Sequence, residues 1–378
     1  MNIFEMINKP TMLLNTSIAK KNISNMVGIA NKSHIKLRPH FKTHQSGEIG
    51  KWFSEEKITG ITVSSVSMAD YFAHHGWQDI MIAFPTNIRE MGTIDRLAGE
   101  INLGLLVESI QTIDYLERSL NNVVDLWIKV DSGSRRTGLD WQNTGEIANL
   151  AKKIIISKRL RLQGLLTHAG NTYHTNNTNE IKTLFAESVS DMNFVRKYLE
   201  SQGTNGLQIS VGDTPGVCLS DEINSVDEIR PGNFIFFDAM QYHLGSCQFD
   251  EIALAVVCPV VALHPERSEV VTYGGAIHLS KDYFENDGIK QYGLVAFPSE
   301  DSWGWGALIP GAYVAGLSQE HGVIHMPASH LHNLKVGDLL CILPAHSCLV
   351  VDQMREYLTL DGGVIKTLYT ETSKLGFI

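Results

Sequence analysis

The sequence lacks a long apolar run and a long run of basic residues. No window approaches the roughly 18 consecutive apolar residues of a membrane-spanning helix. The opening MNIFEMINKP places no basic stretch before an apolar one, so we expect no secretory signal peptide. The formal net charge of −10 disfavours non-specific binding to nucleic acid. We therefore expect neither a membrane nor a nucleic acid as the binding partner.

Cysteine is scarce, and its spacing shows no pairs. The five residues are Cys218, Cys247, Cys258, Cys341 and Cys348. A scattered, odd-numbered set is not typical of a small secreted domain that disulfides stabilise. We expect reduced thiols and a cytoplasmic location.

Short apolar runs alternate with amphipathic segments from residue 35 to about residue 240. Two of these amphipathic segments are TIDYLERSL at 112–120 and EIANLAKKI at 146–154. Strands that alternate with helices indicate parallel βαβ units, and eight such units fit a (β/α)8 TIM barrel, an α/β fold. An open doubly wound sheet is the alternative, but no G-x-G-x-x-G follows the first strand. The expected strands are residues 35–41, 58–65, 79–84, 101–107, 124–130, 160–168, 207–211 and 233–238.

The pattern changes after about residue 240, where valine-rich, alternating runs follow one another without long helices between them. This pattern of alternating runs predicts an antiparallel β domain. We expect a barrel over residues 17–240 and a C-terminal antiparallel β domain over residues 241–378, joined by the N-terminal residues 1–16. The runs are IALAVVCPVVAL, EVVTYGG, YVAGLS, GVIHM, DLLCILP and CLVVD.

Lys42 lies at the end of the first expected barrel strand, in the segment RPHFKTH at 38–44. Barrel enzymes place their chemistry at the C-terminal ends of the strands. The neighbouring histidines and arginine favour the neutral amine that a lysine needs to form a Schiff base. A solvated surface lysine is the alternative, and the residues alone leave both interpretations open.

Two turns near the seventh and eighth expected strands suit a phosphate group. Gly212 and Thr214 offer backbone N–H groups and a hydroxyl, and Gly232 and Asn233 lie close to the eighth strand. Loops near these two strands are the usual phosphate site of a TIM barrel. A tight turn without a ligand is the alternative.

Arg136 follows a glycine-bearing turn directly after the fifth expected strand. Its guanidinium could hydrogen-bond an anionic oxygen in the pocket. A surface arginine beside Arg135 is the alternative interpretation.

The segment His346-Ser347-Cys348 is a candidate metal site. On an extended strand, residues two apart point the same way, so both side chains could reach one ion. Imidazole and thiolate suit zinc, and two protein ligands leave positions open for water or substrate. The alternative is a buried Cys348 in a β core, with His346 at the end of the strand.

Six segments occur in one order along the chain: RPHFKTH, DSGSRRTG, HAGNTY, SVGDTP, RPGNF and PAHSC. This ordered set resembles the D-serine dehydratase and D-threonine aldolase family, which has the alanine-racemase fold type of pyridoxal 5'-phosphate (PLP) enzymes. The resemblance covers nearly the whole chain. It implies an N-terminal (β/α)8 barrel, a C-terminal β domain and a homodimer.

The resemblance also implies roles for the matched residues. Lys42 would bind PLP, Arg136 would lie near the phenolic oxygen and Arg230 near the pyridine nitrogen. His346 and Cys348 would bind a divalent metal, either zinc or manganese. The expected cofactor-binding residues are Lys42, His40, Arg136, Tyr173, Gly212, Thr214, Arg230, Gly232 and Asn233.

The implied activity is that of a lyase on small D-β-hydroxy amino acids. In a dehydratase, Lys42 removes the α-proton and the metal helps the β-hydroxyl to leave, so D-serine gives pyruvate and ammonia. In an aldolase, His174 takes the hydroxyl proton, and glycine and an aldehyde form. The dehydratase ranks first because Cys348 matches the zinc-binding pattern. An amino-acid racemase of the same fold and a non-catalytic PLP-binding homeostasis protein are the alternatives.

Overall fold

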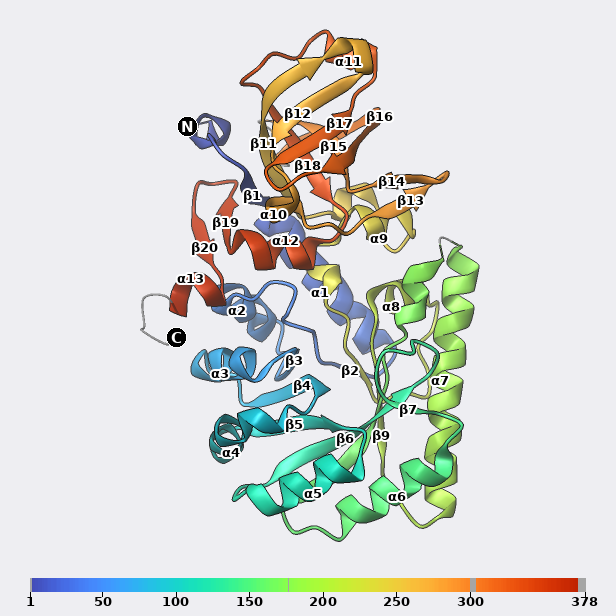
Figure 1. The fold of residues 1–378 in the computed structure, drawn as a ribbon. Coiled ribbons are helices and arrows are strands. Elements are labelled where there is room, and N and C mark those ends of the chain that lie inside the picture. Colours follow the sequence, from blue (N-terminus) through green and yellow to red (C-terminus); the bar gives the residue numbers. More distant parts are fainter. Residues whose placement is uncertain (1, 176, 300–303, 373–378) are drawn as a thin grey trace. The chain divides into compact units, whose positions relative to one another are not determined.

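The computed structural model describes residues 2–175, 177–299 and 304–372. The chain divides into two compact units (Figure 1). The barrel unit comprises Asn25–Lys42 and Gly50–Gly232, and the β unit comprises Met1–Ser24, Thr43–Ile49 and Asn233–Ile378. The domain boundaries expected from the sequence stay a prediction.

Parallel strands close on themselves in the barrel unit. Over the described residues, the strand order is β2-β10-β9-β8-β6-β5-β4-β3. A parallel bridge between His40 and Thr62 joins the two ends, and the Phe41 N–H donates to the Thr62 carbonyl over 2.8 Å. The predicted TIM barrel is thus confirmed. Its strands are β2 (Lys36–Leu37), β3 (Gly60–Val63), β4 (Asp79–Pro85), β5 (Asn102–Val107), β6 (Val124–Asp131), β8 (Leu160–Leu166), β9 (Gln208–Val211) and β10 (Glu228–Ile229), and β7 (Leu139–Asp140) pairs with β6.

The prediction of the last barrel strand is wrong. Residues 233–238 contain the 3-10 turn η4 (Asn233–Ile235) and belong to the β unit. Phe234 and Phe236 are fully buried there, and an apolar run alone does not distinguish a strand from another buried segment. The eighth strand is the two-residue β10, so Arg230 follows a strand end instead of preceding one. This order places Arg230 at the end of the barrel where catalytic residues gather.

Amphipathic helices connect the strands and lie around the outside of the barrel (Figure 1). In α5, for example, Ile113 and Leu116 are the buried residues, spaced one helical turn apart. Between the strands, Met81, Leu106, Trp127 and Leu166 form a buried cluster. The helices are α3 (Val66–His74), α4 (Met91–Glu100), α5 (Ile110–Ser119), α6 (Thr144–Ile155), α7 (Thr178–Ser201) and α8 (Thr214–Leu219), while α1 (Thr16–Lys32) and α2 (Gly47–Glu55) each have residues in both units.

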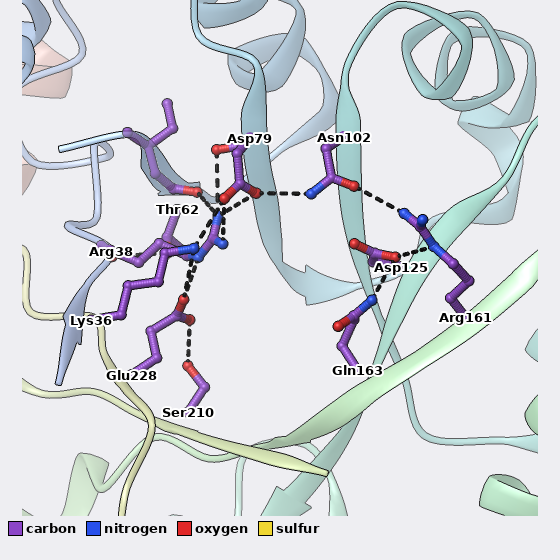
Figure 2. A network of polar contacts seen from close by, with 11 residues as sticks. Lys36, Arg38, Thr62, Asp79, Asn102, Asp125, Arg161, Gln163, Ser210 and Glu228 are labelled. Carbon is purple, nitrogen blue, oxygen red and sulfur yellow. Dashed lines mark hydrogen bonds and ion pairs between the residues drawn. The ribbon is translucent and has the colours of Figure 1, made fainter. Parts of the chain in front are cut away.

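A network of ion pairs holds the N-terminal ends of the barrel strands (Figure 2). Arg38 forms two hydrogen bonds with Asp79, of 2.8 and 2.7 Å, and one of 2.6 Å with Glu228. Lys36 adds an ion pair of 3.1 Å with Asp79. Burial lowers the pKa of Arg38, but Glu228 and Asp79 outweigh it and raise that pKa above its usual value. This end of a TIM barrel commonly serves stability, and the sequence analysis did not predict the network.

The β unit contains a second closed sheet. Its order over the described residues is β12-β17-β16-β15-β18-β11-β1-β19-β20, and an additional β12–β11 pairing closes the first six strands. All pairings are antiparallel, as predicted, except the parallel pair β1–β19. The strands are β1 (Thr11–Leu14), β11 (Leu254–His264), β12 (Glu269–Tyr273), β15 (Gly293–Pro298), β16 (Trp305–Leu317), β17 (His321–His325), β18 (Leu339–Pro344), β19 (Glu356–Thr359) and β20 (Val364–Lys366).

The expected strand at CLVVD is wrong, because these residues lie in the helix α12 (Ser347–Met354). The Ser347 N–H, which has no partner inside the helix, donates to the Asp238 carboxylate over 3.0 Å. Cys348, Val350 and Val351 are buried, a spacing that fits one helix face. The remaining elements of this unit are the hairpin β13 (Phe284–Asn286) and β14 (Ile289–Gln291), and the short helices α9 (Ala239–His243), α10 (Ala276–Leu279), α11 (Ala328–Leu331) and α13 (Leu368–Thr372).

None of the helices that the structure describes is long and apolar enough to span a membrane.

Candidate active site

Lys42 belongs to a cluster of basic side chains in the barrel unit. Its backbone N–H donates to Nδ1 of His40 over 3.5 Å, and its side chain is exposed. Burial and the charges of Lys42 and Arg230 lower the pKa of His40 well below its usual value, with smaller effects from His168 and Arg136. The structure therefore brings together four predicted residues, Lys42, His40, Arg136 and Arg230. His168 joins them although it was not among the expected cofactor-binding residues.

Arg230 is buried directly after β10. Its Nη2 donates to the Thr167 carbonyl over 2.6 Å, and its Nη1 donates to the Ser210 hydroxyl. Burial lowers the pKa of Arg230 to about 10, so the side chain remains a cation at neutral pH. A Cβ at Gly212 would lie 3.0 Å from Cβ of Arg230. Gly212 thus allows the two backbones to approach closely, which is a different reason for glycine from the phosphate contact expected there.

The hydroxyl of Thr214 is a candidate contact for a phosphate group. Its backbone N–H donates to the Tyr173 hydroxyl over 3.4 Å, which brings these two predicted residues together. Its Oγ1 is buried and has no hydrogen-bond partner in the part of the chain that the structure describes. A buried hydroxyl without a partner is costly, so the site suits a ligand with an acceptor group such as a phosphate oxygen.

His168 lies in the same cluster, where it contacts the Gly212 turn and Tyr173. Its Nδ1 hydrogen-bonds the carbonyl of Gly212, and its ring centre lies 6.5 Å from that of Tyr173. Burial, together with the charge of Lys42, lowers the pKa of His168 to about 3. The ring is therefore neutral at physiological pH. Its place in HAGNTY, directly after a barrel strand, was the available sequence signal.

Asp213 is a buried residue of this site that sequence reasoning missed. Its Oδ2 accepts hydrogen bonds from the Gly216 N–H over 2.6 Å and the Thr172 hydroxyl over 2.9 Å. Burial raises the pKa of Asp213 to about 7, although these two hydrogen bonds act in the opposite direction. The carboxylate fixes the turn that presents Thr214.

Lys129 was also missed. It is buried on β6, and its Nζ donates to the carbonyl of Val130 over 2.8 Å. Burial and the charge of Arg230 lower the pKa of Lys129 to about 8. A lysine inside the otherwise apolar strand VDLWIKV was a signal that could have been noticed.

For two other predicted residues, the contacts do not indicate a role. His174 is exposed at the end of the 3-10 turn η3 (Gly170–His174), and Gly232 lies two residues after Arg230. Their expected roles, as a base and in holding the phosphate, stay predictions.

His346 and Cys348 lie together in the β unit, but not on a strand as expected. His346 is the N-cap residue of α12, with extended backbone angles (φ −141°, ψ 101°), and Cys348 lies in the first turn of that helix. Burial lowers the pKa of His346, but the charge of Cys348 and the hydrogen bond with Asp282 outweigh it and raise that pKa well above its usual value. The imidazole and the thiol are thus close neighbours.

Several groups surround this pair. Asp282 Oδ2 lies 2.6 Å from His346 Nδ1. The sulfur of Cys348 lies 3.3 Å from the Thr43 hydroxyl and 3.8 Å from Asn233 Nδ2. The Asn233 amide donates to the sulfur, which therefore acts as an acceptor in that contact.

Asn233 lies beside the same segment. Its Nδ2 donates to Asp238 Oδ2 over 2.6 Å and to the Ser347 hydroxyl over 3.2 Å. Its expected role in holding a phosphate stays a prediction.

The donor types of His346 and Cys348 fit a divalent metal. Among the described residues, no three His, Cys, Asp or Glu side chains form a cluster that could hold an ion by themselves. The pair therefore supplies part of a coordination shell, which leaves positions for water or substrate.

Comparisons with known proteins agree with this architecture. A family model described as "Alanine racemase, N-terminal domain" matches residues 14–240, more than half of the chain. The chain belongs to this family. A second model, of the serine dehydratase domain, matches residues 253–360. Both parts of the resemblance predicted from the six sequence segments are confirmed.

Curated relatives match along nearly their whole length. A D-serine dehydratase of Dictyostelium discoideum is 28% identical, with 93% of each chain covered. A D-threo-3-hydroxyaspartate dehydratase of Delftia sp. (strain HT23) is 25% identical, with 95% of this chain and 96% of the relative covered. A D-threonine aldolase of Arthrobacter sp. is 21% identical, with coverage of 98% and 93%. The predicted enzyme class, a lyase of the dehydratase or aldolase type, agrees with these relatives.

The fold agrees as well. The solved structure of the Delftia dehydratase has a TM-score of 0.86 at 24% identity, covering 96% of this chain and 97% of that chain. A cysteine-to-alanine variant of the same enzyme, solved in the metal-free form, has a TM-score of 0.84. At this identity the likeness shows the fold alone.

Proposed function

We propose that the chain is a PLP-dependent lyase that removes water from D-serine or a similar small D-β-hydroxy amino acid. A divalent metal at His346 and Cys348 would assist the reaction. The observation that carries the proposal is the close imidazole–thiol pair, in a chain whose barrel unit also holds the Lys42 cluster. A cofactor site without this pair would equally suit a racemase or a PLP-binding homeostasis protein.

In the barrel unit, Lys42 would hold PLP covalently through Nζ and remove the α-proton of the substrate. Thr214 would donate its buried hydroxyl to the phosphate, and Tyr173 supports the same turn. Arg230 remains a cation and would face the pyridine nitrogen. When bound, PLP supplies an electron sink for negative charge at Cα.

In the β unit, His346 and Cys348 would hold the metal near the leaving hydroxyl. A bound divalent ion acts as a Lewis acid, which helps an oxygen to leave. We propose zinc rather than manganese, because a thiolate ligand suits zinc and manganese prefers oxygen ligands.

The proposal is tested by a substrate screen with purified, PLP-loaded enzyme. D-serine, D-threonine and D-threo-3-hydroxyaspartate are offered with and without zinc or manganese, and the products are identified. A 2-oxo acid with ammonia supports the dehydratase. Glycine with an aldehyde indicates the aldolase alternative, in which His174 would take the hydroxyl proton. Formation of L-serine from D-serine would indicate a racemase, and PLP binding without turnover would indicate a homeostasis protein.

The role of Lys42 has its own test. Replacing Lys42 by alanine removes the amine that holds PLP, so the visible absorbance of the lysine-bound cofactor should disappear. Lys51→Ala, which removes an exposed lysine of α2, is the control and should keep that absorbance. A Lys42→Ala variant with an unchanged visible band would contradict the assignment.

We further propose a homodimer in a cytoplasmic setting. Sedimentation of the PLP-loaded enzyme tests the first point, and fractionation of cells that express the tagged chain tests the second.

A further inference from the structure

We propose that Asp282 is a positioning residue, which fixes the His346 ring so that Nε2 remains available to the metal. This inference rests on the proposed function, because it requires that His346 and Cys348 bind an ion.

The contact between Asp282 and the imidazole of His346 determines where the ring proton lies. An ionised carboxylate can only accept a hydrogen bond, so the contact of 2.6 Å between Asp282 Oδ2 and His346 Nδ1 places the ring proton on Nδ1. Nε2 is then the nitrogen that can give up its proton and offer a lone pair when a metal binds. A carboxylate bonded to the far nitrogen of a metal-binding histidine commonly fixes both the tautomer and the ring orientation.

The backbone of the metal segment is fixed separately. Asp238 Oδ2 accepts from the Ser347 N–H over 3.0 Å and from the Ser347 hydroxyl over 3.3 Å. Ser347 lies between the two candidate ligands. With the backbone held in this way, rotation of the His346 side chain is the remaining freedom, and Asp282 restrains it.

Asp282 is itself held in place. It lies between α10 and β13, and its N–H donates to the Ser280 hydroxyl over 3.2 Å. The Ser280 N–H donates to Gln353 Oε1 over 2.9 Å, and Gln353 belongs to α12. The segment that carries Asp282 is therefore tied to the helix that begins with the metal pair.

Two other roles for Asp282 fit the structure less well. The side chains of Asp282 and His346 are 44% and 34% exposed, and ion pairs with this much exposure contribute little stability. A direct metal ligand is also disfavoured, because the two ring nitrogens point in diverging directions. An ion on Nε2 would lie away from the carboxylate that is bonded to Nδ1.

The test is a comparison of zinc affinity in metal-stripped, PLP-loaded variants, measured by competition with a chromophoric chelator. Asp282→Ala should raise the dissociation constant for zinc about 10- to 100-fold, the usual effect of losing such a partner. Asp282→Asn, whose amide oxygen can still accept the Nδ1 proton, should lose less affinity. Glu285→Ala removes a carboxylate from the neighbouring hairpin, opposite Lys290, and should match wild type.

Two further measurements distinguish a positioning role of Asp282 from a general loss of folding stability. Cobalt titration should still give thiolate-to-cobalt absorbance in Asp282→Ala at saturating metal, because Cys348 is unchanged. The unfolding midpoint of the metal-free variant should equal that of metal-free wild type.

Unchanged zinc affinity in Asp282→Ala, or an equal loss in Glu285→Ala, would overturn this inference alone. A wild-type chain that binds no zinc would overturn the metal site of the proposed function together with it.

Discussion

At the scale of single residues, the groups with the strongest electrostatic effects combine partners that are close in the sequence with partners that lie far away. His40 loses basicity through burial and two cations, one of which, Arg230, follows the last barrel strand. Burial alone would lower the pKa of His346, but the charge of Cys348 and the hydrogen bond with Asp282 outweigh it and raise that pKa. Similar residue types thus acquire different protonation states from their surroundings.

Thr214→Val tests the phosphate site at this scale. The variant keeps the shape of the side chain but loses the buried hydroxyl that has no partner within the described chain. Affinity for PLP should fall about 10- to 100-fold, because a hydrogen bond to a charged group is worth about 1.5–3 kcal/mol. Equilibrium dialysis measures the loss. The cofactor-free variant should unfold at the wild-type midpoint or above it, and unchanged PLP affinity would contradict the role.

Asp213→Asn tests a pH dependence. The folded pKa of Asp213 is raised to about 7, above the unfolded value near about 4, so this group stabilises the fold most at low pH. That stability is lost as the pH rises through this window, by up to about 4 kcal/mol. In cofactor-free protein, urea unfolding from pH 4 to 8 should show a smaller decline for Asp213→Asn than for wild type. Parallel curves would contradict the prediction.

Whether a site residue could be predicted depends on how far its partners lie from it in the sequence. Lys42 could be predicted, because its neighbours His40 and His44 are adjacent in sequence. Asp282 and Asp238 could not, because they lie 64 and 109 residues from their partners His346 and Ser347. No pattern of spacing connects such distant positions.

At the scale of secondary structure, long periodic segments were predictable and short ones were not. The strands β3 to β6, β8 and β9 coincide with apolar runs in the sequence. β10 has only two residues, so no periodicity marks it. The valine-rich α12 was mistaken for a strand, because contacts to Asp238 stabilise its first turn and propensity alone favours β structure.

The ion-pair network at the strand starts gives a prediction at this scale. Arg38 and Glu228 are 7% and 2% exposed and lie 2.6 Å apart. Glu228→Ala leaves a buried guanidinium with less compensation, so the free energy of unfolding should fall by about 3–5 kcal/mol. Glu100→Ala breaks the exposed ion pair with Arg96 and should change stability by less than about 1 kcal/mol. Urea unfolding measures both, and equal effects would contradict the importance of the buried network.

At the scale of the whole molecule, the two groups of candidate site residues belong to separate units. The barrel unit holds the Lys42 cluster, and the β unit holds the His346–Cys348 pair. The sequence analysis predicted both groups of residues, because each is a local motif. The division into units falls next to Lys42, since Thr43–Ile49 belongs to the β unit although barrel residues precede and follow it.

This separation gives a prediction about metal and cofactor. His346→Ala should retain PLP with the wild-type visible absorbance but lose most of its activity on D-serine. A ligand that binds only the folded state stabilises it by RT ln(1 + [L]/Kd), which is about 2.7 kcal/mol at 100 times Kd. Zinc should therefore raise the unfolding midpoint of wild type and leave that of His346→Ala unchanged. Equal shifts would place the metal elsewhere.

The most direct measurement of the central claim is turnover of D-serine by PLP-loaded enzyme before and after removal of the metal. We expect that pyruvate formation stops after chelation, that the visible absorbance of the cofactor on Lys42 persists, and that added zinc restores the rate. Full pyruvate formation by enzyme that is demonstrably free of metal would contradict the account.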